Sequence, residues 1–253
     1  MAHDPAGPGG LYQAFVLHRR DYGDTSLLVE VFALGQGRFP AIARGARRSR
    51  RSSSALLQPF QPLWVGLAGR GEVRTLTRVE SAGRPLGLAG VALPCGFYLN
   101  ELLMRLLGRG DPHDPLFGLY QAALVGLEVG EGLHGALRRF ELRLLEELGY
   151  GPALDVTADG EPIRPDGRYR LEPGQAPVPA DGVHRDGTLG GCTLLALATD
   201  APLQGDQQRE ARSLLRALLA PHLGTKPLQS RELLRQWRGL RGARAGDPFD
   251  APG

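Results

Sequence analysis

Residues 38–51, RFPAIARGARRSRR, join a strand-like run to a strongly basic loop. Phe39 and Ile42 give the first part the apolar character of a β-strand, and Gly45 then interrupts it. The loop that follows carries Arg47, Arg48, Arg50 and Arg51. No acidic residue occurs between Glu30 and Glu72, so this positive charge has no local balance. Because like charges repel, so dense a cluster favours an anionic partner; the alternative is a solvated charge run or a nonspecific loop.

The β pattern extends on both sides of this stretch, from Leu11 to Glu80. Apolar runs separated by Gly-containing turns predict five short strands, at residues 11–17, 25–33, 38–43, 57–67 and 72–79. Pro59 and Pro62 place the fourth strand at an edge or beside a bulge. Five strands in about 70 residues predict a small closed barrel, and the OB-fold is the commonest five-stranded type. An SH3-like barrel is the competing structure.

Beyond Pro85 the apolar spacing becomes helical. Helices are predicted at residues 98–107, 116–127, 133–148, about 193–197, 206–219 and 230–240. Residues 151–191 are instead dense in Pro, Gly and Asp, with a candidate hairpin formed by 168–171 and 182–184. The predicted fold class is therefore α+β, an N-terminal five-stranded OB-fold barrel followed by a helical domain with a small irregular or β insertion.

The same patterns predict a domain plan. Residues 1–10 form a disordered N-terminus, 11–83 an OB-fold nucleic-acid-binding domain, and 84–150 plus 193–240 a helical domain. Residues 151–192 form a small insertion subdomain without zinc, and 241–253 a disordered tail.

Composition narrows the class of protein. The chain has 253 residues, a formal charge of +3 and a single lysine, Lys226. A GC-rich genome explains the use of Arg in place of Lys, but it does not explain the clustering of the arginines. No apolar run reaches the roughly 20 residues of a membrane helix, and the N-terminus lacks the pattern of a secretory signal. We expect a cytoplasmic, nucleoid-associated protein that does not bind membranes.

Motifs for catalysis are absent from the sequence. There is no Gly-x-x-x-x-Gly-Lys phosphate loop, no Gly-x-Ser-x-Gly elbow and no His-Glu-x-x-His pair. Cys95 and Cys192 are the only cysteines and do not form a Cys-x-x-Cys pair, which excludes a zinc site built mainly from thiolates. We therefore predict no enzyme, no cofactor and no metal.

Aromatic residues are interleaved with the cations of the barrel segment. Exposed aromatic rings between cations can stack on the bases of a single strand. Most of these rings must fill the barrel, and Tyr22 and Phe39 are the best candidates for exposure.

Several blocks of sequence, in a shared order, resemble the RecO family of DNA repair proteins. The blocks are FVLHRR (15–20), TSLL (25–28), ARGAR (43–47), LQPFQPL (57–63), GRGEV (69–73), YLNELL (98–103), LRRFE (137–141), LGY (148–150) and KPLQSREL (226–233). Each block alone is a weak signal of the family, but together, in their shared order, they span roughly residues 11 to 236.

The resemblance implies an N-terminal OB-fold, a central helical domain and an inserted third subdomain. It also implies a recombination mediator of the RecF pathway that binds single- and double-stranded DNA and anneals complementary strands. Such a protein acts with RecR, and in some pathways RecF, to let RecA replace the single-strand-binding protein, and it docks on that protein's acidic C-terminal tail. Some family members bind zinc through four cysteines of the insertion; residues 151–191 contain none, so this chain resembles the zinc-free branch.

Two sets of side chains are the candidate binding residues. The predicted phosphate contacts come from Arg44, Arg47, Arg48, Arg50 and Arg51, with help from Arg19, Arg20, Arg38 and Arg70. The predicted contacts to the acidic tail come from Arg138 or Arg139 beside the apolar stripe of Leu137 and Phe140, with Lys226 and Arg231 nearby.

For the tail site the resemblance points to Arg138. The alternative is an ordinary arginine on a helix surface, paired with Glu141 or Glu146. For the whole chain, the alternatives are an OB-fold RNA-binding or ribosome-associated factor and a protein-only adaptor.

Overall fold

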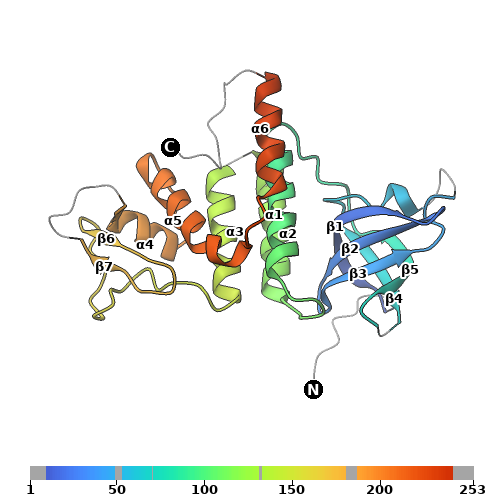
Figure 1. Cartoon of the computed structure of the whole chain (residues 1–253), viewed down its shortest axis with the longest axis horizontal. Coiled ribbons are helices and arrows are strands. Elements are labelled where there is room, and N and C mark those ends of the chain that lie inside the picture. Colours follow the sequence, from blue (N-terminus) through green and yellow to red (C-terminus); the bar gives the residue numbers. More distant parts are fainter. Residues whose placement is uncertain (1–9, 49–52, 70, 131–132, 181–186, 242–253) are drawn as a thin grey trace. The chain divides into compact units, whose positions relative to one another are not determined.

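The computed structural model describes residues 10–48, 53–69, 71–130, 133–180 and 187–241 of the chain (Figure 1). The predicted disordered ends fall almost entirely outside these residues. Across the described part of the chain, no helix is long and apolar enough to cross a membrane.

The described residues form two compact units. The first contains the described residues up to Glu128 together with Leu228–Ser230, and the second contains the described residues of Val129–Pro227 and those from Arg231 onward. The helices at residues 92–106 and 114–129, which the sequence analysis assigns to the helical domain, thus belong to the same unit as the barrel. The predicted domain bounds stay predictions.

Four antiparallel strand pairs and one parallel pair close the barrel of the first unit. Its strands are β1 (Tyr12–Tyr22), β2 (Ser26–Ala33), β3 (Gly37–Ala43), β4 (Leu63–Ala68) and β5 (Arg74–Ser81), in the spatial order β1-β2-β3-β5-β4. β3 and β5 run parallel and share only the pairs Ala41–Arg74 and Ile42–Thr75. The predicted OB-fold barrel followed by helices and a small sheet is confirmed.

Alternate residues of the strands fill the barrel. Ala14 and Val16 of β1 point inward together with Leu27, Val29 and Val31 of β2. The rest of this core comes from Ala33, Phe39, Ala41, Ala43, Ala46, Leu57, Leu63, Val65 and Leu76. This period of two is the signature of a strand with one buried face, and it explains why the sequence patterns found most of these strands.

The fourth predicted strand was wrong in its first half. Leu57 is buried and Pro59 forms an isolated bridge with Val16, but regular pairing starts only at Leu63. The prolines explain this, because Pro has no N–H to donate to a ladder. A short 3₁₀ turn, Ser53–Ala55, precedes this segment.

A β-bulge at Leu17 changes the alternation along β1. Val16 pairs with Val31 and His18 pairs with Glu30, so Leu17 is the extra residue. Its carbonyl oxygen accepts a hydrogen bond from Asn100 Nδ2 at 2.9 Å. A bulge leaves one residue without a partner in the ladder, and here the side-chain amide of a helix provides that partner.

Two helices, α1 (Ala92–Leu106) and α2 (Asp114–Val129), run beside the barrel within the first unit (Figure 1). Phe15 and Phe32, on the outer face of the barrel, contact Phe117 and Tyr120 of α2, with ring centroids 5.2 to 6.2 Å apart. The Tyr120 hydroxyl donates to Asn100 Oδ1 at 2.6 Å, so a buried polar chain links α2, α1 and the bulge.

Glu101 holds the first turn of the last helix. α6 spans Gln229–Arg241, and the Glu101 carboxylate accepts hydrogen bonds from the backbone N–H groups of Gln229 and Ser230, each at 2.9 Å. The Ser230 hydroxyl donates to the same carboxylate at 2.7 Å, as does Arg105 Nη2. The first N–H groups of a helix have no acceptor inside it, and Glu101 supplies one from α1.

The second unit contains α3 (Leu133–Glu147), α4 (Gly191–Ala198), α5 (Asp206–Leu223) and a three-stranded sheet. The sheet has the order β7-β6-β8, formed by β6 (Arg168–Arg170), β7 (Val178–Pro179) and β8 (Leu189–Gly190). β6 thus pairs with β7 and β8; of the predicted hairpin partners, residues 182–184 lie outside the described residues.

A carboxylate on α5 ties this sheet to the helices. Glu210 Oε1 accepts from Arg168 Nη1 at 2.7 Å, and Glu210 Oε2 accepts from Gly190 N at 3.0 Å and from the Thr193 hydroxyl. Burial opposes ionisation of Glu210, but the hydrogen bonds from Thr193, Gly190 and Arg168 outweigh it and keep its pKa below the ordinary value. These polar contacts thus join the small sheet and α4 to α5.

Candidate nucleic-acid interface

Three strands bring a mixed basic and apolar row to one end of the barrel. Arg20 of β1 lies opposite Leu28 of β2, and Leu28 lies opposite Ile42 of β3. Arg44 follows two residues after Ile42, at the next position of the same alternation. Arg20 and Arg44 are exposed, while Leu28 and Ile42 are half-buried. We call Arg20, Leu28, Ile42 and Arg44, with Tyr22, the tip face.

The bulge decides which side chains reach the tip face. Before Leu17, the odd-numbered residue Phe15 lies on the outer face, where it contacts α2. After the extra residue, the even-numbered residues His18, Arg20 and Tyr22 lie on that face, opposite Glu30, Leu28 and Ser26. A one-residue change in register exchanges the two faces of a strand. Without the bulge, Arg19 and Asp21 would occupy the tip face instead.

Tyr22 ends β1 with its ring in solvent. Its side chain is 51% exposed, and the residue pairs with Ser26 across the β1–β2 turn. An exposed ring beside cations provides a surface on which a base can stack. The prediction for Phe39 was wrong, because its ring is only 2% exposed and belongs to the barrel core. Arg74 covers that ring with its guanidinium 4.4 Å from the ring centroid.

Arg19 and Arg47 lie at the same end of the barrel but are held by protein atoms. Arg19 donates to the carbonyl oxygens of Ser54 and Leu57, at 3.2 and 3.5 Å. Arg47 forms an exposed ion pair with Asp21 at 3.0 Å. Arg48 is exposed, and its backbone N–H donates to Gly45 O at 3.0 Å in the turn after β3.

Arg38 stabilises the fold of the first unit by joining β2 and β3 to the end of α1. Its guanidinium pairs with Glu30 and also donates to the Leu107 carbonyl oxygen, at 2.8 Å from Nη2 and 3.2 Å from Nε. Arg109 lies 3.5 Å from the same Glu30 carboxylate. Because these contacts occupy the side chain, we leave Arg38 out of the proposed interface.

Of the predicted phosphate-binding arginines, the structure therefore brings five together at the tip of the barrel. These are Arg19, Arg20, Arg44, Arg47 and Arg48. Arg50, Arg51 and Arg70 lie outside the described residues.

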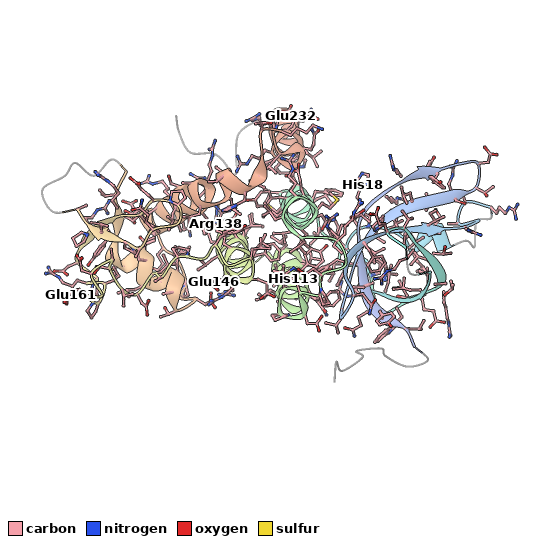
Figure 2. All side chains as sticks on the ribbon, turned by 60° about the horizontal axis from the view of Figure 1, so that its bottom comes forward. His18, His113, Arg138, Glu146, Glu161 and Glu232 are labelled. Atoms are coloured by element: carbon pink, nitrogen blue, oxygen red, sulfur yellow. The ribbon has the colours of Figure 1, made fainter. Side chains whose placement is uncertain are left out.

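The predicted tail-binding residues differ sharply in exposure. Arg138, labelled in Figure 2, is on α3 and is only 3% exposed; it pairs with the buried Glu141 at 3.0 Å. Arg139 is exposed, and its Nε lies 3.4 Å from the Asp200 carboxylate. Lys226 is exposed and Arg231 is half-buried. In the structure, Arg138 thus forms the ion pair with Glu141 that the sequence analysis gives as the alternative to tail binding.

No group of three or more His, Cys, Asp or Glu side chains that could hold a metal ion occurs among the described residues. Cys95 is buried, and Cys192 is exposed with its thiol 3.2 Å from the Pro165 carbonyl oxygen.

Sequence reasoning missed the apolar half of the tip face and the residues that position it. Leu28 and Ile42 read as ordinary strand residues, and Asn100 as an ordinary helix residue. The four consecutive apolar residues Ala14 to Leu17 do not alternate, so the sequence gives no sign of which of the charged residues after them face outward.

Comparisons with known proteins agree with this architecture. The family described as Recombination protein O N terminal matches residues 11–84, and the one described as Recombination protein O C terminal matches residues 89–232. The first covers the barrel, and the second covers all the helices but the last part of α6.

Individual relatives match over nearly their whole length. DNA repair protein RecO of Methylococcus capsulatus is 51% identical over 231 residues, which cover 89% of this chain and 93% of the relative. DNA repair protein RecO of Alkalilimnicola ehrlichii is 48% identical over 241 residues, covering 94% and 96%. That of Pseudomonas paraeruginosa is 47% identical over 219 residues, covering 87% and 92%. The chain therefore belongs to the RecO family and has a role in DNA repair and recombination.

Proposed function

We propose that this chain is a recombination mediator that binds single- and double-stranded DNA and anneals complementary strands. Together with RecR, and in some pathways RecF, it helps RecA to load onto DNA coated with single-strand-binding protein. The tip face is the observation that carries the proposal, because it combines exposed guanidinium groups with an exposed ring and half-buried apolar side chains.

The composition of the tip face supports binding without sequence preference. Arg20 and Arg44 offer charge to phosphates, which carry no sequence information. Tyr22 offers a ring that can stack on any base. The neutralised phosphates of two strands no longer repel each other strongly, while most base edges remain free to pair. Annealing is the chemical consequence of such a surface.

Changing Arg20, Arg44 and Arg48 together to Ala is expected to weaken DNA binding and reduce its salt dependence. Each lost phosphate contact should lower the slope of log affinity against log salt by about 0.7 for a single strand, and hence by about 2 for the triple variant. The measurement is a fluorescence anisotropy titration of a short single-stranded oligonucleotide at several salt concentrations.

The matched control is Arg78→Ala. Arg78 is an exposed barrel arginine on β5 whose guanidinium pairs with Glu80 at 2.6 Å. Its loss should leave the salt slope nearly unchanged. A triple variant with the slope of the wild type would contradict the placement of the interface, and preference for RNA over DNA would favour the ribosome-associated alternative.

We further propose that the acidic C-terminal tail of the single-strand-binding protein docks on the second unit through Arg139, with Lys226 as a second cation. The exposure of both side chains supports this choice. Arg138 is a poor contact in this state, because a tail carboxylate would have to reach a guanidinium that is 3% exposed and already paired.

Arg139→Ala is expected to weaken binding of a synthetic acidic tail peptide by about 10-fold, the scale of one charge-assisted hydrogen bond. Arg143→Ala provides the control, since Arg143 shares the Asp200 partner but is less exposed. The assay is calorimetric titration of the peptide into the full chain. Unchanged affinity in Arg139→Ala would reject Arg139. Arg138→Ala is unsuitable as the only test, because it leaves Glu141 buried without its cation.

A further inference from the structure

At the tip of the barrel, the Asp21 carboxylate forms an ion pair with the guanidinium of Arg47. Asp21 Oδ2 lies 3.0 Å from Arg47 Nη1, and the same nitrogen donates to the Gly23 carbonyl oxygen at 3.5 Å. The Arg47 backbone N–H donates to Thr25 O at 2.9 Å. The loop after β3 is thus folded back on the β1–β2 turn, and a carboxylate sits where a phosphate oxygen would otherwise bind.

This pair differs from its neighbours in two respects. Arg20, Arg44 and Arg48 have no carboxylate partner among the residues that the structure describes, so at this end of the barrel Arg47 is the cation that a protein anion already neutralises. The pair is also open to water, with side-chain exposures of 36% for Arg47 and 71% for Asp21. An exposed ion pair of this kind is weak and easily exchanged for another anion.

We infer that Asp21 is an internal competitor for DNA phosphate. In the free protein it holds Arg47, and a bound strand displaces it and takes its place. Binding must then pay for the lost pair, so Asp21 lowers the affinity for DNA and favours release of the strand. A protein that joins strands and then leaves the duplex needs this reversibility. The inference rests on the proposed function and deepens it.

The turn supplies a matched control for the loss of a negative charge. Asp24 is exposed on the same β1–β2 turn, three residues after Asp21, and has no ion pair within the described part of the chain. Asp21→Asn and Asp24→Asn therefore change the net charge equally and at nearly the same place. Only Asp21→Asn removes the partner of Arg47.

The experiment measures the affinity of the full chain for a single-stranded oligonucleotide by fluorescence anisotropy. Asp24→Asn should raise the affinity slightly through long-range attraction, whereas Asp21→Asn should raise it by a further two- to five-fold. The excess should disappear when both substitutions are repeated in an Arg47→Ala background, because the released guanidinium is then missing.

Each outcome decides the matter. Equal gains in the two variants would mean that Asp21 acts only through its charge and would overturn the inference. A loss of affinity in Asp21→Asn would mean that Asp21 prepares Arg47 for the phosphate, which also overturns it. Failure of the proposed function is distinct, since the wild-type chain would then show no salt-dependent binding to compare with.

Discussion

Replacing Glu101 with Ala is expected to lower the free energy of unfolding by about 3 kcal/mol, measured by urea denaturation of the full chain. Glu101 is buried, and its removal leaves two backbone N–H groups and one hydroxyl of Gln229 and Ser230 without their acceptor. Each buried donor left unpaired costs about 1–3 kcal/mol. Arg105 loses its ion-pair partner as well.

Controls separate this network from a general loss of charge. Glu80→Ala removes a carboxylate that pairs with Arg78 on the surface of the same unit, and it should cost less than about 1 kcal/mol. Ser230→Ala removes only one of the donors and should cost an intermediate amount. Equal stabilities of Glu101→Ala and Glu80→Ala would contradict the role given to Glu101.

The same network makes stability depend on pH in a defined direction. Burial disfavours the charged form of Glu101, but the hydrogen bonds from Ser230 and Gln229 and the charge of Arg105 outweigh it and hold its pKa below the ordinary value. A group whose pKa is lower in the folded state stabilises the fold above its unfolded pKa, about 4.3 for Glu, and loses this contribution as the pH falls through the folded pKa. Below about pH 4, the difference in stability between wild type and Glu101→Ala should therefore shrink.

Asn100→Leu is the second change for which we expect a large effect, a loss of about 3 kcal/mol in the free energy of unfolding. The substitution removes the buried hydrogen bonds that Asn100 forms with the Leu17 carbonyl oxygen and with the Tyr120 hydroxyl, at about 1–3 kcal/mol each. Gln121→Leu, on an exposed position of α2, is the matched control and should change stability by no more than about 0.5 kcal/mol.

A double-variant cycle tests the polar chain itself. Tyr120→Phe removes only the hydroxyl and should cost about 1 kcal/mol in the wild-type background. In the Asn100→Leu background it should cost much less, because the hydroxyl has already lost its hydrogen bond to Asn100 Oδ1 there. Strictly additive losses would show that Tyr120 and Asn100 do not act together.

Local pattern was sufficient to predict most elements of this fold. The inward residues Val29, Val31 and Ala41 alternate with outward ones, and this period of two revealed β2 and β3 directly. The amphipathic spacing around Phe140 likewise predicted α3 almost to the residue. The segment from Leu57 to Pro62 misled the prediction because it is buried like a strand but cannot pair like one.

Contacts between residues that are far apart in the chain could not be predicted from one sequence. Asn100 meets Leu17, 83 residues away, and Glu101 meets Ser230, 129 residues away, and nothing local in either partner signals these pairings. The exchange of faces at Leu17 also depends on the ladder, so the sequence could not tell whether Arg19 or Arg20 belongs to the outer surface. The ion pair between Arg38 and Glu30 was easier to predict, because both residues lie on the outward side of neighbouring strands.

The closure of the barrel is uneven, and this determines where it is weakest. β1 and β2 share eight residue pairs, whereas β3 and β5 share two. Arg74 reinforces this short seam, because it belongs to β5 while its guanidinium lies over Phe39 of β3 and donates to Gln36 at 2.6 Å. We therefore expect transient opening of the barrel to begin along this seam, where it would expose two strand edges able to pair with another chain. By holding these two strands together, Arg74 is expected to reduce aggregation of the barrel.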